Sequence, residues 1–198
     1  MKIDLVKNDK NYYSAKKTPD LREFNSLKYI TILGKGEPAG VAFTNAIEAL
    51  YPLAYGIRKI YKSQNIVFSV SKLEGLWWVE SDQNALDVPR SEWYWKLLIR
   101  MPKPVEEQHF IEAKNEVYKK KKIELIKDIQ FEELNEGKCV QIMHVGPYSA
   151  EPESIQQMKE FMTENSLTED GLHHEIYISD PRKTEPEKMK TILRQPVS

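Results

Sequence analysis

The apolar positions of the chain recur at a spacing of two in some stretches and at three and four in others, which separates predicted strands from predicted helices. Apolar stripes predict helices over 43–61, 104–121 and 152–162. Alternating or continuous apolar runs predict strands over 29–33, 66–79, 93–100, 139–145, 173–178 and 190–196. We expect Pro52 to kink or break the first helix near Tyr51, and Gly75 to introduce a bulge in its strand.

The second half of the chain repeats the order of the first. KLLIRMP at 96–102 resembles KTILRQP at 190–196, and GLWW at 75–78 resembles GLHH at 171–174. This predicts an α+β fold made of tandem, pseudo-symmetric βαββ repeats. We place the first repeat at about 28–102, a connecting helix at about 104–121 and the second repeat at about 128–197.

The first 27 residues are polar and charged, with Tyr12 and Tyr13 as their aromatic anchor. We therefore expect residues 1–27 to be an N-terminal extension that lies over a single domain formed by residues 28–198.

Two βαββ sheets set side by side would leave a groove on the faces that their helices do not cover. In the strand HEIYI, Glu175 and Tyr177 share one face, and Ile176 and Ile178 share the other. Because the isoleucines are expected under the helix, Glu175 and Tyr177 are expected to face the groove. A carboxylate in mid-strand is usually solvated on an open face, and the alternative is a carboxylate that lines a cleft.

Composition narrows the choice of partners. The chain has 198 residues, 40% of them hydrophobic, which is enough for a substantial core. With 30% charged residues and a net charge of −1, neither sign dominates, so we expect no nucleic-acid and no membrane partner. The basic run Lys119–Lys122 is expected to be a solvated helix end rather than a phosphate-binding patch.

The N-terminus has no signal-peptide pattern, and no apolar run is long enough to span a membrane. Cys139 is the chain's one cysteine and lies in an apolar run, so we expect a buried, inert thiol rather than a nucleophile. These features predict a cytoplasmic protein.

Several kinds of site have no matching motif. His173, His174 and Glu175 are adjacent and point to alternating faces, which is poor geometry for one metal ion. Gly34 and Gly36 lack the spacing of phosphate-binding or dinucleotide-binding loops. We therefore predict no metal and no cofactor. There is also no Gly-x-Ser-x-Gly elbow for covalent acyl chemistry.

Aromatic side chains are the other candidates for a binding role. Tryptophans and tyrosines lie on or beside elements that would flank the groove, where they could pack the core or form the walls of a ligand site. They are Trp77, Trp78, Trp93, Trp95, Tyr51, Tyr55, Tyr94, Tyr148 and Tyr177.

The strings LEGLWW, WYWKLLIRMP, EGKCVQIMHVGPY and HHEIYISDPRKTEPEKMKTILRQPV closely resemble standalone GyrI-like proteins, from about Lys28 to the C-terminus. The resemblance implies a tandem βαββ domain that binds small molecules. Similar domains form the drug-sensing half of AraC- and MerR-type regulators, where the carboxylate of an E-[IV]-Y strand meets cationic aromatic ligands. The matching residues here are Glu175, Ile176 and Tyr177. The sequence shows no DNA-binding module, so the resemblance does not imply a transcription factor.

A subfamily of standalone GyrI-like proteins is reported as cyclopropanoid cyclopropyl hydrolases. This resemblance implies Glu175 as general base or water-orienting group. It also implies ligand contacts from aromatic residues, namely Tyr55, Trp77, Trp95, Tyr148 and Tyr177. The expected partner is a small planar aromatic compound, either cationic or cyclopropanoid. Binding without catalysis is one alternative. Regulation of a protein partner is another, as GyrI-like relatives are reported to do with DNA gyrase. The oligomeric state is left open.

Overall fold

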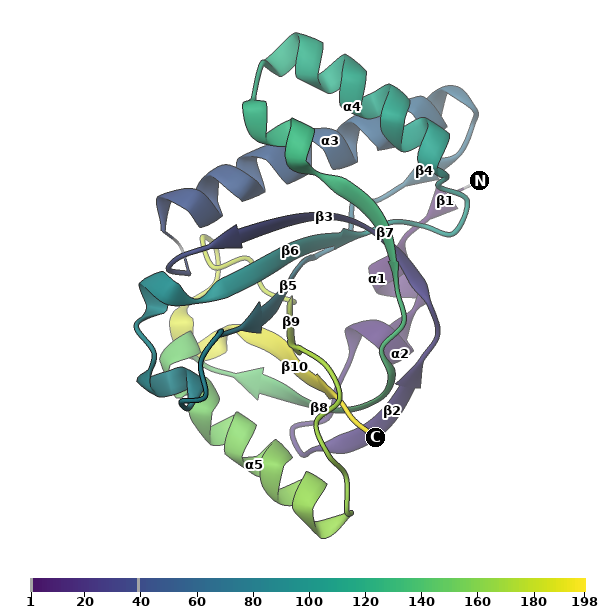
Figure 1. Cartoon of the computed structure of the whole chain (residues 1–198). Coiled ribbons are helices and arrows are strands. Elements are labelled where there is room, and N and C mark those ends of the chain that lie inside the picture. Colours follow the sequence, from purple (N-terminus) through teal and green to yellow (C-terminus); the bar gives the residue numbers. More distant parts are fainter. Residues whose placement is uncertain (1, 39) are drawn as a thin grey trace. The chain divides into compact units, whose positions relative to one another are not determined.

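The computed structural model describes residues 2–38 and 40–198 of the chain, and these residues form two compact units (Figure 1). Unit 1 contains the residues up to Asn8 together with Leu27–Leu134, and unit 2 contains Asp9–Ser26 together with Asn135–Ser198. Both units combine antiparallel strands with helices, which confirms the predicted α+β class.

In unit 1 the main sheet has the antiparallel order β5–β6–β3–β7, and β1 pairs with β4 in a separate parallel ladder. Its strands are β1 (Lys2–Ile3), β3 (Leu27–Lys35), β4 (Val67–Phe68), β5 (Leu73–Trp78), β6 (Tyr94–Arg100) and β7 (Gln130–Leu134). Its helices are α1 (Leu5–Asn8), α3 (Val41–Ser63), α4 (Glu107–Lys121) and the short 3₁₀ turns η1 (Ala85–Asp87), η2 (Arg90–Glu92) and η3 (Glu124–Asp128).

The core of unit 1 lies between α3 and one face of this sheet. Ile30 and Ile32 of β3 pack there with Leu97 and Ile99 of β6. Helix α4 packs against α3, as Figure 1 shows, and Gly56 makes the close approach possible. A Cβ atom at Gly56 would lie 2.6 Å from the Val117 side chain.

Unit 1 differs from the local predictions at Pro52 and at Gly75. The helix does not break at Pro52, because α3 runs without interruption from Val41 to Ser63. Leu50 and Leu53 on either side of the proline are fully buried, and their packing outweighs the hydrogen bond that proline removes. There is also no bulge at Gly75, which pairs with Leu97 in a continuous register. The predicted 66–79 strand is instead divided into β4 and β5, because β4 pairs with β1.

Unit 2 has a sheet with the antiparallel order β2–β8–β10–β9. Its elements are α2 (Lys10–Tyr13), β2 (Asp20–Phe24), β8 (Gly137–Val145), η4 (Tyr148–Ala150), α5 (Glu151–Glu164), β9 (His173–Tyr177), η5 (Pro186–Lys188) and β10 (Lys190–Pro196). Helix α5 begins at Glu151, next to the predicted start at 152, and has Pro152 in its first turn. Its Met158 and Met162 pack on Val140 and Ile142 of β8 and on Leu193 of β10.

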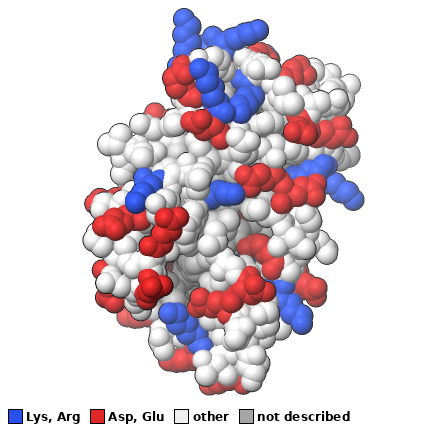
Figure 2. All heavy atoms as spheres, in the orientation of Figure 1, with Lys and Arg blue, Asp and Glu red and all other residues white. Residues whose placement is uncertain are grey.

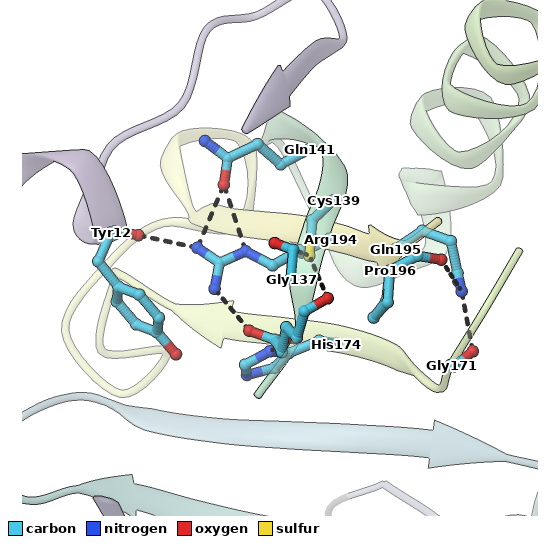
Figure 3. A network of polar contacts seen from close by, with 10 residues as sticks. Tyr12, Gly137, Cys139, Gln141, Gly171, His174, Arg194, Gln195 and Pro196 are labelled. Carbon is cyan, nitrogen blue, oxygen red and sulfur yellow. Dashed lines mark hydrogen bonds and ion pairs between the residues drawn. The ribbon is translucent and has the colours of Figure 1, made fainter. Parts of the chain in front are cut away.

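The opposite face of this sheet carries a buried polar network centred on Arg194, which is fully buried (Figure 3). The guanidinium donates to Gln141 Oε1, to Glu136 Oε2 at 3.0 Å and to the Tyr12 carbonyl at 3.1 Å. It also stacks 3.8 Å from the centre of the Phe24 ring. Arg194 therefore connects the N-terminal segment of unit 2 to its C-terminal strand.

The N-terminal segment is arranged differently from the prediction. We expected residues 1–27 to lie over the domain, but Asp20–Phe24 form an edge strand with Leu21 opposite Val140. The backbone groups along that edge of β8 are thereby satisfied, and this compensates for the low strand propensity of the charged sequence. The counterpart of β2 in unit 1 is β7, which pairs with β3 and places Phe131 opposite Ile30.

The repeat is present as β3–α3–β5–β6 and β8–α5–β9–β10, with the additional β4 in the first copy. KLLIR of the first string lies in β6 and KTILRQP forms β10, which confirms the first sequence match. The second sequence match, of GLWW at 75–78 with GLHH at 171–174, does not agree with the strand register. Gly75 pairs with Leu97, and Tyr177 pairs with Thr191, the counterpart of Leu97. Gly75 thus corresponds to Tyr177 rather than to Gly171.

Charged side chains of both signs are interspersed over the face shown in Figure 2. The basic cluster at the top of that view lies over the end of α4, where Lys119–Lys122 are exposed as predicted. None of the helices in the described part of the chain has the length and apolarity that crossing a membrane requires.

Candidate functional site

Strand β9 places Glu175 on the face of the unit 2 sheet that α5 covers. Glu175 is directly opposite Leu193, which packs against α5, and Tyr177 is opposite Thr191 on the same face. The expectation that Ile176 lies under the helix is therefore wrong. The apolar surface beneath α5 comes from β8 and β10, so β9 is free to carry polar side chains there, and Ile176 is buried on the other face.

Both carboxylate oxygens of Glu175 have an aromatic neighbour. The Tyr177 hydroxyl donates to Oε2 at 2.8 Å, and His173 Nε2 lies 3.6 Å from Oε1. The side chain of Glu175 is only 13% exposed. A carboxylate with so little contact with water attracts a cation more strongly than a solvated one does, because fewer water dipoles screen its charge.

Tyr148 completes this arrangement from the turn η4 that precedes α5. Its ring meets the Tyr177 ring edge to face, with centroids 6.1 Å apart. Burial, followed by the charges of Glu151, Glu175 and Asp180, raises the pKa of Tyr148 to about 12. The phenol therefore keeps its proton at neutral pH and can donate a hydrogen bond. The carboxylates around it also make this end of unit 2 favourable for cations.

Arg182 fixes the charge of one of these carboxylates. Its hydrogen bonds from the side chain and the backbone lower the pKa of Asp180 to about 2. Asp180 is thus ionised throughout the physiological range.

Unit 1 contains an aromatic cluster at the beginning of α3. Trp77 of β5 and Trp95 of β6 are directly opposite each other and buried. Phe43 stacks on Trp77 with centroids 5.7 Å apart and meets Trp95 edge to face at 5.5 Å. Trp93 contacts Trp77 at 6.1 Å. Such a cluster combines a large apolar surface with indole N–H donors.

Gly34 makes room for the Trp95 ring. A Cβ atom at Gly34 would lie 2.1 Å from a carbon of that ring, which is far closer than real contacts allow. The indole Nε1 of Trp95 is buried and has no hydrogen-bond partner among the described residues. A donor left in this state is costly, and a ligand acceptor would satisfy it.

The structure thus brings Glu175, Tyr177 and Tyr148 together in unit 2, and Trp77 with Trp95 in unit 1. Tyr55 lies on α3 with 55% of its surface exposed, outside the aromatic cluster. Trp78 and Tyr94 stack on each other elsewhere on the unit 1 sheet.

The sequence analysis did not predict that His173 and Glu151 lie near Glu175 and Tyr148, or that Phe43 and Gly34 contact the tryptophans of unit 1. Phe43 is the first residue of the apolar stripe that predicts the helix over 43–61, and the local sequence shows no feature that distinguishes it from its apolar neighbours. For His173, however, the period-two spacing from Glu175 was a usable signal. In the part of the chain that the structure describes, no group of three His, Cys, Asp or Glu side chains is placed to hold a metal ion.

The family model of the GyrI-like small molecule binding domain matches residues 17–198. A crystal structure of an uncharacterized conserved protein from Listeria innocua is 37% identical, with a TM-score of 0.92 over 99% of this chain and 100% of that chain. A hydrolase from Listeria innocua is also 37% identical, with a TM-score of 0.89 over the full length of both chains.

A more distant structure, the EcmrR C-terminal domain, shares the fold at 12% identity, with a TM-score of 0.57 over 91% of this chain and 97% of that chain. No curated protein matches the chain. The family match over almost the whole chain, together with these structures, shows that the chain belongs to the GyrI-like small-molecule-binding domain family.

Proposed function

We propose that the protein binds planar aromatic cations at Glu175 and hydrolyses cyclopropanoid compounds there. The observation that carries the proposal is the shielded carboxylate of Glu175, held by the Tyr177 hydroxyl beside the Tyr148 ring. Aromatic rings stack on flat ligands and attract cations, and a carboxylate adds charge pairing. The hydrolase from Listeria innocua, 37% identical to this chain, supports an enzymatic role.

The proposed reaction adds water to a cyclopropane ring conjugated to a dienone. The water oxygen forms a bond to the ring methylene carbon as a ring carbon–carbon bond breaks. The electron pair of that bond moves to the carbonyl oxygen, which becomes a phenol when it takes a proton. Glu175 is the proposed base that accepts the proton of the water. Tyr148, which keeps its proton at neutral pH, is a candidate acid, with Tyr55 and a water molecule as alternatives.

Trp77, Trp95 and Tyr55 of unit 1 are proposed as ligand-binding residues on the strength of the family resemblance. Trp77 and Trp95 lie in the buried aromatic cluster of unit 1, so these two contacts rest on the resemblance alone. Tyr55 is exposed and lies outside that cluster.

Binding is tested by fluorescence titration with a rhodamine- or ethidium-type cationic dye and with an anionic dye of similar size. We expect Glu175→Gln to weaken cationic dye binding by about tenfold or more, because it removes a charge-assisted contact. The matched control is Glu169→Gln, which removes an exposed carboxylate of the same unit and should change nothing. Equal wild-type affinity for cationic and anionic dyes would contradict the binding proposal.

Catalysis is tested by following ring opening of a cyclopropapyrroloindole by chromatography, against a buffer control. Loss of a general base typically costs about 10²- to 10⁴-fold in rate, and we expect Glu175→Gln to lose that much. If Glu175→Gln opens the ring as fast as the wild type, the base assignment is wrong. If the wild type binds the cationic dye but opens the ring no faster than buffer, the protein is a binder without catalysis, the second candidate function, which the family description supports.

A further inference from the structure

His173 shares one face of β9 with Glu175 and Tyr177, and it approaches the carboxylate oxygen that Tyr177 does not use. Its Nε2 is 3.6 Å from Glu175 Oε1, whereas Tyr177 donates to Oε2. This distance is too long for a hydrogen bond, but it is short enough for a strong charge interaction. Nε2 is buried and has no hydrogen-bond partner among the described residues. Nε2 of His173 therefore lies near Glu175 Oε1 and is not hydrogen-bonded to another described residue.

The charge at Glu175 depends on the state of this imidazole. With His173 neutral, Glu175 presents an unpaired negative charge that a cation can use. With His173 protonated, the imidazolium and the carboxylate form an ion pair with no net charge. Histidine is the side chain that ordinarily changes its charge between about pH 5 and 8.

We propose that His173 is a positioning residue that competes with cationic ligands for Glu175 Oε1 and so sets the pH range over which the site binds them. The inference rests on the proposed cation binding at Glu175 and adds a proton-linked mechanism to it. By linkage, a bound cation makes protonation of His173 less favourable, and protonation of His173 weakens binding of the cation.

The other charged groups on this side of unit 2 do not replace His173. Tyr148 of η4 stays neutral because its pKa is raised, and Asp180 stays ionised because Arg182 lowers its pKa. Glu151 of α5 adds negative charge near Tyr148 and so favours cations in both states of the imidazole.

The other histidines of unit 2 have partners of their own. His144 of β8 is hydrogen-bonded on both nitrogens, by Ser154 and by the Pro147 carbonyl. His174 lies on the opposite face, beside Arg194 (Figure 3), and its Nδ1 contacts Glu136. His173 is thus the unit 2 imidazole that lies against Glu175.

The test is the dissociation constant of a rhodamine-type cationic dye at pH 5.5, 6.5, 7.5 and 8.5 and constant ionic strength. We expect the wild type to bind the dye several-fold more tightly at pH 7.5 than at pH 5.5, because the imidazolium that forms at low pH pairs with Glu175. His173→Gln keeps a polar side chain but cannot gain the proton, so its affinity should be constant. A neutral dye of the same shape should show no pH dependence with either protein. The same slope in wild type and His173→Gln, or with the neutral dye, would overturn the inference.

A second measurement needs no ligand and separates this inference from the proposed function. The ring protons of His173 are followed by NMR as a function of pH in wild type and Glu175→Gln. We expect the midpoint to move to lower pH in the variant, because the neighbouring negative charge is gone. An unchanged midpoint overturns the coupling of His173 to Glu175, even if dye binding is confirmed. A shifted midpoint supports the coupling, even if no dye binds and the proposed function fails.

Discussion

At the residue scale, Glu136 shows how the fold stabilises a buried charge. Burial would by itself raise the pKa of Glu136, but the charge and hydrogen bond of His174, followed by those of Arg194, outweigh it and lower the pKa to about 2. The His174 contact is 2.7 Å long, and the Arg194 contact is 3.0 Å. The ionised carboxylate is therefore part of the folded structure.

The folded-state pKa of Glu136 lies below the usual 4.5, so its stabilising effect is complete above about pH 4.5 and is lost as the pH falls towards 2. We expect the free energy of unfolding of the wild type to fall over this window by on the order of 3 kcal/mol from this group. Glu136→Gln should be less stable than wild type at pH 6 and should lose less stability on acidification.

Urea unfolding at pH values from 6 to 2.5 measures this effect, and Glu169→Gln is the control because that carboxylate is exposed. An equally steep acid loss in Glu136→Gln and wild type would show that Glu136 is not the responsible group.

Cys139 lies close to the same network and is buried, as the sequence predicted. Burial, with a smaller effect from the charge of Glu136, raises the pKa of this thiol to about 12. The thiolate is therefore absent at neutral pH, which agrees with an inert cysteine.

The contact of Gly34 with Trp95 gives a second prediction at this scale. Gly34→Ala should destabilise the protein by about 1–3 kcal/mol, because its Cβ would overlap the Trp95 ring and the ring would have to move. Leu33→Ala is the control on the same strand, since Leu33 is 61% exposed and should cost less than about 0.5 kcal/mol. Urea denaturation followed by tryptophan fluorescence compares the two, and similar midpoints would show that the ring relaxes without cost.

At the element scale, the edge strands β2 and β7 were not predicted. Their sequences, DLREF and QFEEL, are rich in charge and lack the apolar alternation of the inner strands. Charged side chains are common on edge strands because they discourage pairing with other chains. What makes these segments strands is the neighbouring ladder, with Leu21 opposite Val140 and Ile30 opposite Phe131.

Strand β2 offers a matched pair of variants. Phe24 is buried, and its ring lies 3.8 Å from the Arg194 guanidinium, whereas Leu21 is 45% exposed. We expect Phe24→Ala to cost about 3–5 kcal/mol of unfolding free energy, because a buried ring and its contact with a cation are lost. Leu21→Ala should cost much less. Chemical denaturation tests this, and comparable losses in both variants would contradict the role given to the Phe24 contact.

At the scale of the whole molecule, the chain passes between the units more than once. Unit 2 needs Asp9–Ser26 in addition to Asn135–Ser198. Within unit 2, Phe24 pairs with Gly137, so Ser26 and Asn135 come close to each other at the end of a strand pair. Joining Ser26 directly to Asn135 would leave a loop of about four residues, a common hairpin length.

We therefore predict that residues 135–198 alone do not fold, because they lack β2 and the Tyr12 and Phe24 contacts of Arg194. Residues 9–26 joined directly to 135–198 should fold, with a cooperative thermal transition in circular dichroism. The same cooperative transition in both fragments would show that the N-terminal segment is dispensable for unit 2. An unfolded fusion would show that unit 2 requires unit 1.

The α+β class, the repeat, the main helices and inner strands, and Glu175 as a candidate site residue could be predicted from the sequence, because they depend on local periodicity and on motifs. Features that depend on pairing between distant segments could not be predicted in this way. The register of β9 against β10 placed Glu175 opposite Leu193 on the α5 face, against our prediction, and gave His173 its position beside the carboxylate. The pairing of β2 with β8 made an apparent extension part of a sheet. A period of two determines which side chains share a face, but only the neighbouring strand and the packed helix determine which face that is.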